Sequence, residues 1–178
     1  MLRRQWVPSG DLLPAAELIH MVDDLASLPV HIATRLAEEL DAIWLGPGAV
    51  PDLDDLGHLR GQAIPSGVAL WDVVPGMCTG RIIAIGTSAH VSASLVLHEV
   101  GHALDVWDGM SSSAEWTTVM KMISPHIQHP RYLDTVEWFA EAYALCASGQ
   151  AGRLLRMLDG QENLAAVVWG YFRRHYGV

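Results

Sequence analysis

The spacing of hydrophobic residues along the chain changes near residue 92. Before that point, apolar residues form short runs that Gly, Pro and Asp interrupt, whereas after it they recur every three or four positions, as in amphipathic helices. The first part predicts helices over 11–27 and 31–40, strands over 42–45, 68–74 and 81–85, and a long loop over 46–67. The second part predicts helices over 92–108, 114–128, 134–148, 150–159 and 161–175. Strands that precede helices in this way favour an α+β fold.

Length and composition are those of a folded globular protein. A chain of 178 residues suits one domain over residues 1–178, and 51% hydrophobic with 17% charged residues argues against disorder. No apolar run approaches the roughly 18 residues that a membrane-spanning helix needs. Arg3 and Arg4 are not followed by an apolar stretch, so the start is not typical of a secretory signal. We therefore expect a cytoplasmic protein without a membrane partner, and export by a route without a signal stays open.

Charge and cysteine content narrow the classes of partner. The formal net charge of −9 disfavours nucleic acid as a partner, because binding to phosphates needs a basic face. The two cysteines, Cys78 and Cys146, are too few for a disulfide framework and do not form a C-x-x-C pair. We expect both to be free thiols in a reducing compartment. The sequence gives no indication of the oligomeric state.

One motif in the helical part carries recognisable chemistry. His98-Glu99-Val100-Gly101-His102 has the form H-E-x-x-H, and on a helix two residues four positions apart share a face. Two imidazoles one turn apart can bind one zinc ion at about 2.0–2.1 Å. Glu99 lies beside them, where its carboxylate can take a proton from a metal-activated water. The motif therefore predicts a zinc site with Glu99 as the general base.

The rest of this helix supports the motif. Leu97, Val100 and Leu104 fall on the side opposite the two histidines, so the helix has an apolar face for the core and an imidazole face for a cleft. Gly101 costs about 1 kcal/mol relative to alanine inside a helix. Its presence predicts the close approach of another segment, such as a second backbone.

A catalytic zinc takes a third protein ligand, and the sequence offers two candidates. Asp108 stands six residues after His102, but the glycine that would break the helix between them is missing, because that position is Asp105. Glu137, on the next but one predicted helix, is the better candidate. Its alternative role is to cap the start of that helix, since Asp134-x-x-Glu137 resembles a capping box.

The two acidic positions of the later helix are one turn apart. Glu137 and Glu141 share a face, while Phe139 and Tyr143 lie on the opposite side. If Glu137 binds zinc, Glu141 is placed to accept a hydrogen bond from a ligand imidazole and so to fix its tautomer.

Two segments together resemble a known family. The stretch from His98 to Asp105 reads HEVGHALD, and the stretch from Glu137 to Tyr143 reads EWFAEAY. They resemble the catalytic domain of anthrax lethal factor and the related Pro-Pro endopeptidases, which have H-E-x-G-H-x-x-D followed by E-(F/Y)-F-A-E. The resemblance covers about residues 95–145, and Trp138 takes the place of the usual Phe or Tyr.

The resemblance implies a zincin-like fold, in which a small mixed sheet packs against the H-E-x-x-H helix and a second helix carries a glutamate ligand. It implies that Glu137 is the third zinc ligand and that Glu141 matches the second glutamate of the family motif. It also implies a tyrosine that stabilises the tetrahedral intermediate. Tyr132 is the natural match, although it stands five residues before Glu137 where the family has seven; its alternative role is surface packing.

Two further positions follow from this arrangement. Asp105 shares the metal-facing side with His98 and could orient a ligand, or it could equally cap or pair with a nearby group. Zincins usually bind an extended substrate beside an edge strand above the metal helix, where backbone hydrogen bonds are free. Residues 81–85 are our candidate for that strand, and an interior strand is the alternative.

The leading hypothesis is a zinc-dependent endopeptidase that acts on a peptide or protein substrate. In this hypothesis Glu99 shuttles the proton and Tyr132 holds the oxyanion. A second hypothesis is a non-catalytic protein of a larger assembly that keeps a zincin fold, although an intact Glu99 counts against it. A third is a regulatory peptidase that cleaves a repressor, whose third-ligand region usually differs from EWFAE.

Overall fold

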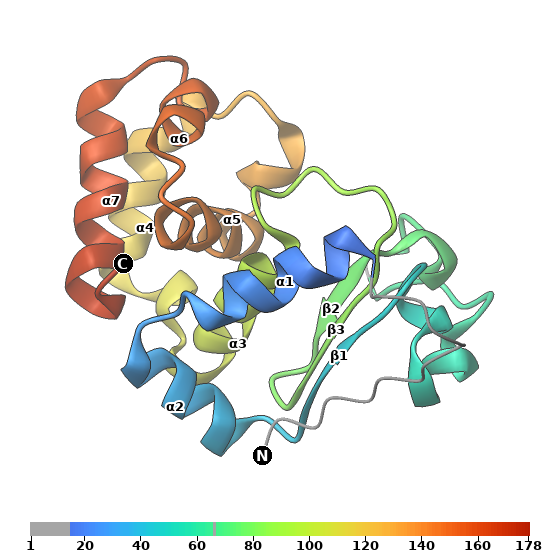
Figure 1. Ribbon diagram of the computed structural model, residues 1–178. Coiled ribbons are helices and arrows are strands. Elements are labelled where there is room, and N and C mark those ends of the chain that lie inside the picture. The colour runs from blue at the N-terminus through green and yellow to red at the C-terminus, as the bar shows by residue number, and fades with distance from the viewer. Residues whose placement is uncertain (1–14, 66) are drawn as a thin grey trace. The chain divides into compact units, whose positions relative to one another are not determined.

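The computed structural model describes residues 15–65 and 67–178 of the chain (Figure 1). The chain divides into two compact units, one that extends to Val91 and one that begins at Ser92. The change in hydrophobic spacing near residue 92 falls at this boundary. The prediction of a single domain over residues 1–178 stays a prediction.

The first unit contains two helices and a small sheet. Its regular elements are α1 (Ala16–Ala26), α2 (Val30–Glu39), β1 (Ala42–Leu45), β2 (Gly76–Cys78) and β3 (Ile82–Ile85). The sheet has the order β1-β3-β2, with β1 parallel and β2 antiparallel to β3. The helix predicted over 11–27 begins outside the described residues, and its described part agrees with α1.

Two predictions about this sheet are wrong. Residues 68–74 form a 3-10 turn (Trp71–Val73) after an isolated bridge at Leu70, and the second strand follows them as β2. Val68 and Val73 are exposed, so this β-branched run buries no face that would hold a strand. The strand at 81–85 is not an edge: β3 is the central strand, because both β1 and β2 pair with it.

The loop predicted over 46–67 is more regular than expected. It contains two 3-10 helices, Val50–Asp52 and Asp54–Leu59. The carboxylate of Asp52 accepts a hydrogen bond from the backbone N–H of Ala49 at 2.8 Å and so closes the first of these turns. Turns of this kind are short and locally bonded, and they have no hydrophobic period that a sequence pattern could reveal.

The second unit consists of helices. They are α3 (Leu95–Asp108), α4 (Ala114–Ile123), α5 (Thr135–Ala147), α6 (Ala151–Met157) and α7 (Glu162–Tyr176). Helix α5 lies at the centre of the unit, in contact with α3, α6 and α7 (Figure 1), and every residue from Trp138 to Cys146 is buried. With seven α-helices and one mixed sheet in the described residues, the α+β class is confirmed.

Aromatic packing holds the helical unit together. Trp116 of α4, Phe139 of α5 and Phe172 of α7 are fully buried and contact one another edge to face or tilted, with ring centroids 5.1–5.5 Å apart. Such pairs contribute about 0.5–1.5 kcal/mol each beyond the burial of their area. This cluster fixes α5, and with it the acidic residues on the α3 side.

The backbones of α3 and α5 approach each other closely at Gly101. A Cβ placed on Gly101 would lie 2.8 Å from the Cα of Ala140 and 3.0 Å from its carbonyl oxygen. The close backbone approach predicted from Gly101 is therefore confirmed. It brings the histidine face of α3 within reach of the acidic face of α5.

No helix in the described ranges is long and apolar enough to cross a membrane. Cys78 and Cys146 are not joined by a disulfide bond, as expected. The cytoplasmic location expected from the sequence stays a prediction.

Candidate metal centre

The two histidines of the H-E-x-x-H motif meet on one face of α3. Ser94 caps this helix, because its hydroxyl accepts a hydrogen bond from the backbone N–H of Leu97 at 3.3 Å. Ten of its 14 residues are buried, and the helical turn brings the Nε2 atoms of His98 and His102 to 3.1 Å. Two ring nitrogens at this distance can share either a proton or a cation.

Glu137 joins the histidines from α5. Asp134 is the N-cap of α5, with its carboxylate accepting from the backbone N–H groups of Val136 and Glu137. Because Asp134 caps the helix, the Glu137 side chain is left to reach α3. Its Oε2 lies 3.6 Å from His98 Nε2, and its Oε1 lies 3.9 Å from His102 Nε2.

The three donor atoms have the spacing of a metal ligand set. All lie within 4.8 Å of one another. A tetrahedral ion with bonds of about 2.0–2.1 Å holds its ligand atoms about 3.3–3.4 Å apart, and the separations here bracket that value. Two imidazoles and one carboxylate are donors that first-row divalent ions accept. The residues present therefore fit a metal ion, with further positions left for water or substrate.

Glu141 fixes the orientation of His98. The Nδ1–H of His98 donates to Glu141 Oε2 at 3.2 Å, which leaves the lone pair of Nε2 for the metal position. The other carboxylate oxygen of Glu141 accepts from the backbone N–H of Ala93 at 2.8 Å, and Arg153 lies 3.7 Å away. Glu141 thus joins α5 to the segment that leads into α3.

The ligand set is enclosed on one side and open on the other. The side chains of His98 and Glu141 are 0% exposed, whereas those of His102 and Glu137 are 18% and 29% exposed. A substrate can therefore approach from the side of His102 and Glu137.

The two histidines differ in their affinity for a proton. Burial alone would lower the pKa of His98, but its contacts with the Glu137 and Glu141 carboxylates outweigh burial and raise the pKa to about 9. Burial and the charge of His98 lower the pKa of His102 to about 4. The pair therefore binds one proton near neutral pH, and a metal ion must displace it.

The two acidic residues nearest the histidines are shifted in opposite directions. Burial raises the pKa of Glu99 to about 7, although the charge of His98 opposes this shift. Burial would also raise the pKa of Glu137, but His98 and Arg131 lower it to about 2. Glu137 is therefore negatively charged near neutral pH and can bind a cation. Glu99, in contrast, can take and return a proton near neutral pH.

Three residues singled out from the sequence lie outside the donor set. Asp105 Oδ1 accepts from the backbone N–H of Ser111 at 2.6 Å, so this carboxylate ties the end of α3 to the next turn. Asp108 accepts from the hydroxyl of Tyr176 at 3.1 Å, and it is not among the three clustered ligands. Tyr132 is buried, and its role stays a prediction.

Sequence reasoning missed two arginines beside the acidic groups. Arg131 donates from Nε to Glu137 Oε2 at 2.7 Å, and Arg153 lies near Glu141. The charge pattern gave only a general signal: the two motif segments contain three glutamates and no Lys or Arg, which favours basic residues from other segments nearby but does not say which ones.

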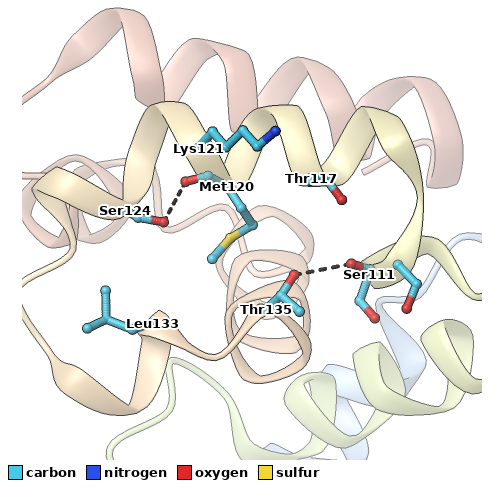
Figure 2. Close-up of a pocket in the computed structure, with 8 residues that line it drawn as sticks. Ser111, Thr117, Met120, Lys121, Ser124, Leu133 and Thr135 are labelled. Carbon is cyan, nitrogen blue, oxygen red and sulfur yellow. Dashed lines mark hydrogen bonds between the residues drawn. The ribbon is translucent and has the colours of Figure 1, made fainter.

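A second hollow lies on another part of the helical unit. It has a volume of about 360 Å³, and Figure 2 shows that the hydroxyls of Ser124 and Thr135 bond to backbone carbonyls at its wall. Neither histidine nor carboxylate lines it, so it is separate from the donor set. Its lining consists of Ser111, Ser112, Thr117, Met120, Lys121, Ser124, Leu133 and Thr135.

Comparison with known proteins finds one matching family model and similar solved structures. Residues 7–156 match the family model described as anthrax toxin lethal factor, N- and C-terminal domain. Among solved structures, the Pro-Pro endopeptidase PPEP-2 from Paenibacillus alvei is similar with a TM-score of 0.70 and 23% sequence identity, over 93% of this chain and 95% of that chain. No curated protein sequence matches the chain significantly.

Proposed function

The chain belongs to the anthrax toxin lethal factor domain family and is a hydrolase of the metalloprotease class, and on this premise we propose that it is a zinc-dependent endopeptidase. In this proposal His98, His102 and Glu137 bind the ion. The observation that carries it is that the donor atoms of these three residues converge. The distances are 3.1 Å between the two histidines, 3.6 Å from His98 to Glu137 and 3.9 Å from His102 to Glu137.

The mechanism uses the residues around this donor set. When bound, zinc lowers the pKa of a water molecule to about 7 and polarises the scissile carbonyl. Glu99 takes the proton of the attacking water and returns it to the leaving amine, which a pKa near neutrality suits. Glu141 holds the His98 ring in one tautomer. The resemblance implies that Tyr132 donates a hydrogen bond to the oxyanion.

The substrate is a peptide or protein. The similar PPEP-2 structure is named as that of a Pro-Pro endopeptidase. We propose peptides with a Pro-Pro bond as the first sequences to test. A peptide library with randomised residues on both sides of the bond is the second test, since the pockets for flanking residues differ between members of a fold.

The test is hydrolysis by zinc-loaded protein, followed by mass spectrometry, beside the Glu99→Gln variant. We expect cleavage that stops with a chelator, and a loss of about 10²–10⁴-fold in rate for Glu99→Gln with zinc still bound. Normal cleavage by Glu99→Gln would contradict the role of Glu99. Bound zinc without cleavage of any library peptide would instead favour the non-catalytic alternative.

A further inference from the structure

The 3-10 turn before α5, Pro130–Leu133, gives two neighbouring side chains very different surroundings. Tyr132 is only 2% exposed, and its ring packs edge to face on Trp138 with centroids 5.8 Å apart. Its hydroxyl is enclosed and has no hydrogen-bond partner in the part of the chain that the structure describes. Burial and the charge of Glu141 raise the pKa of this phenol, so it lies close to the enclosed carboxylate of Glu141.

Arg131 lies at the exposed side instead. Its side chain is 45% exposed, and its Nε donates to Glu137 Oε2 at 2.7 Å. The same oxygen is 3.6 Å from His98 Nε2, so the guanidinium is separated from the ligand set by a single carboxylate. Arg131 therefore lies on the partly exposed side of the three donor atoms, where we expect a substrate carbonyl to enter.

The guanidinium has unused donors and a permanent charge. An arginine side chain offers five N–H groups and stays protonated in proteins. Over the described residues, Nε makes the contact with Glu137, and the Nη groups of Arg131 have no protein acceptor. Arg153, the other arginine of this region, lies instead beside the enclosed carboxylate of Glu141.

We propose that an Nη–H of Arg131 donates to the oxyanion that develops on the scissile carbonyl, the role that the resemblance gives to a tyrosine. The proposal rests on the proposed function. The water oxygen bonds to the carbonyl carbon, the π electrons move to the carbonyl oxygen, and Glu99 takes the water proton. The C–N bond then breaks and Glu99 returns that proton to the amine. Arg131 exchanges no proton and stabilises the negative oxygen between these two events.

The test compares four variants with wild type on a cleaved peptide. Arg131→Met removes the charge and keeps the aliphatic stem, and Arg131→Lys restores the charge. Tyr132→Phe removes only the hydroxyl. Arg174→Met is the matched control, because Arg174 also forms one ion pair with a glutamate, at 2.6 Å from Glu115, away from the donor set.

We expect Arg131→Met to lower kcat by about 10²–10³-fold with little change in KM, as for removal of one oxyanion donor. We expect Arg131→Lys to recover part of this loss, Tyr132→Phe to lose less than Arg131→Met, and Arg174→Met to stay within about 3-fold of wild type. A large loss in Tyr132→Phe together with a near-normal Arg131→Met would overturn the proposal.

Two binding measurements separate this role from simple positioning of Glu137. A phosphinic pseudopeptide of the cleaved sequence copies the tetrahedral anion, and calorimetry gives its affinity without turnover. We expect Arg131→Met to weaken it by about 10²-fold, while the intact peptide binds the Glu99→Gln and Glu99→Gln/Arg131→Met proteins equally. If Arg131→Met weakens the binding of the pseudopeptide and of the intact peptide equally, or if excess zinc restores its activity, then Arg131 only positions Glu137. Either outcome overturns the proposal.

The proposed function is checked separately in wild type. If wild-type protein binds no zinc and cleaves no library peptide, the endopeptidase assignment fails and the Arg131 proposal falls with it. If wild type binds zinc and cleaves while Arg131→Met keeps full kcat, only the Arg131 proposal fails.

Discussion

The carboxylate of Glu141 is fully enclosed where it meets His98, whereas that of Glu137, one turn earlier on α5, is partly exposed. The two residues have the same side chain and lie on the same face of one helix. One oxygen of Glu141 accepts from the backbone N–H of Ala93 and the other contacts His98 Nδ1, so both oxygens hold neighbouring groups in position. Glu137 faces the two Nε2 atoms and Arg131. The two residues are of the same type, so it is the groups around each carboxylate that make Glu141 a positioning residue and Glu137 a candidate metal ligand.

Among changes that leave the three donor residues in place, the largest effect is expected from Glu141→Gln. The amide keeps the size of the side chain but loses the charge, and it cannot accept from both His98 and Ala93 as a carboxylate does. We expect the zinc affinity to fall by about 10–100-fold while the fold is kept. Calorimetric titration with zinc measures this change. An unchanged affinity would show that the enclosed side does not orient the ligand.

The substitution Gly101→Ala tests the close contact between α3 and α5. The new Cβ would lie 2.8 Å from the Cα of Ala140, so α3 and α5 must separate. We expect a loss of stability of about 1–3 kcal/mol, as for other overpacked sites, and a zinc affinity lowered about tenfold because the histidines move away from Glu137.

The matched control is Gly170→Ala on α7. A Cβ there would meet a single side-chain atom, Arg174 Nη1, at 3.5 Å. Alanine should therefore stabilise this helix by about 0.5–1 kcal/mol without affecting zinc. Denaturant unfolding of both variants checks the pair, and equal effects at the two positions would contradict the close approach at Gly101.

The proton on the histidine pair makes zinc binding depend on pH. Zinc must displace the Nε2 proton of His98, whose pKa is about 9, while His102 and Glu137, with pKa values of about 4 and 2, are already deprotonated above pH 7. We expect the affinity to rise up to about tenfold per pH unit between pH 7 and 9 and to level off above. Titration in buffers of different ionisation enthalpy should show about one proton released per ion at pH 8. No proton release would be inconsistent with a raised pKa at His98.

The smallest effect is expected from Arg153→Met. Arg153 is 3.7 Å from a carboxylate that also has a backbone and an imidazole partner, and it is partly exposed. We expect the zinc affinity to fall less than in Glu141→Gln, by no more than about 5-fold, because partly exposed ion pairs contribute little. If the zinc affinity fell further in Arg153→Met than in Glu141→Gln, the charge of Arg153 would matter more for zinc binding than the hydrogen bonds of the Glu141 carboxylate.

The helical half could be predicted further from the sequence than the sheet. The spacing of His98 and His102, the position of Gly101 and the five helices all follow from a period of 3.6 residues, which is a local property. The strand at 68–74 was wrong because β-branched composition was taken for burial. The edge position of the strand at 81–85 was wrong because strand order depends on contacts between distant segments.

In the candidate site, too, residues on regular helices could be predicted and residues in the irregular turn before α5 could not. The motif spacing pointed to the three clustered donors, and the shared face of α5 pointed to the contact of Glu141 with His98. The position of Arg131 beside Glu137 could not be predicted, because it comes from an irregular turn whose side-chain directions follow no period. Tyr132, one residue later, was chosen by resemblance, yet its hydroxyl is enclosed.

The most direct test of the central claim is the zinc content and zinc affinity of wild type, Glu137→Ala and Asp108→Ala, by elemental analysis and calorimetry. We predict about one zinc per chain in wild type and in Asp108→Ala. In Glu137→Ala we predict a loss greater than the roughly 10–100-fold that removal of a ligand's hydrogen-bonding partner costs. Zinc that is unaffected by Glu137→Ala, or absent from wild type after supplementation, would contradict the three-residue site.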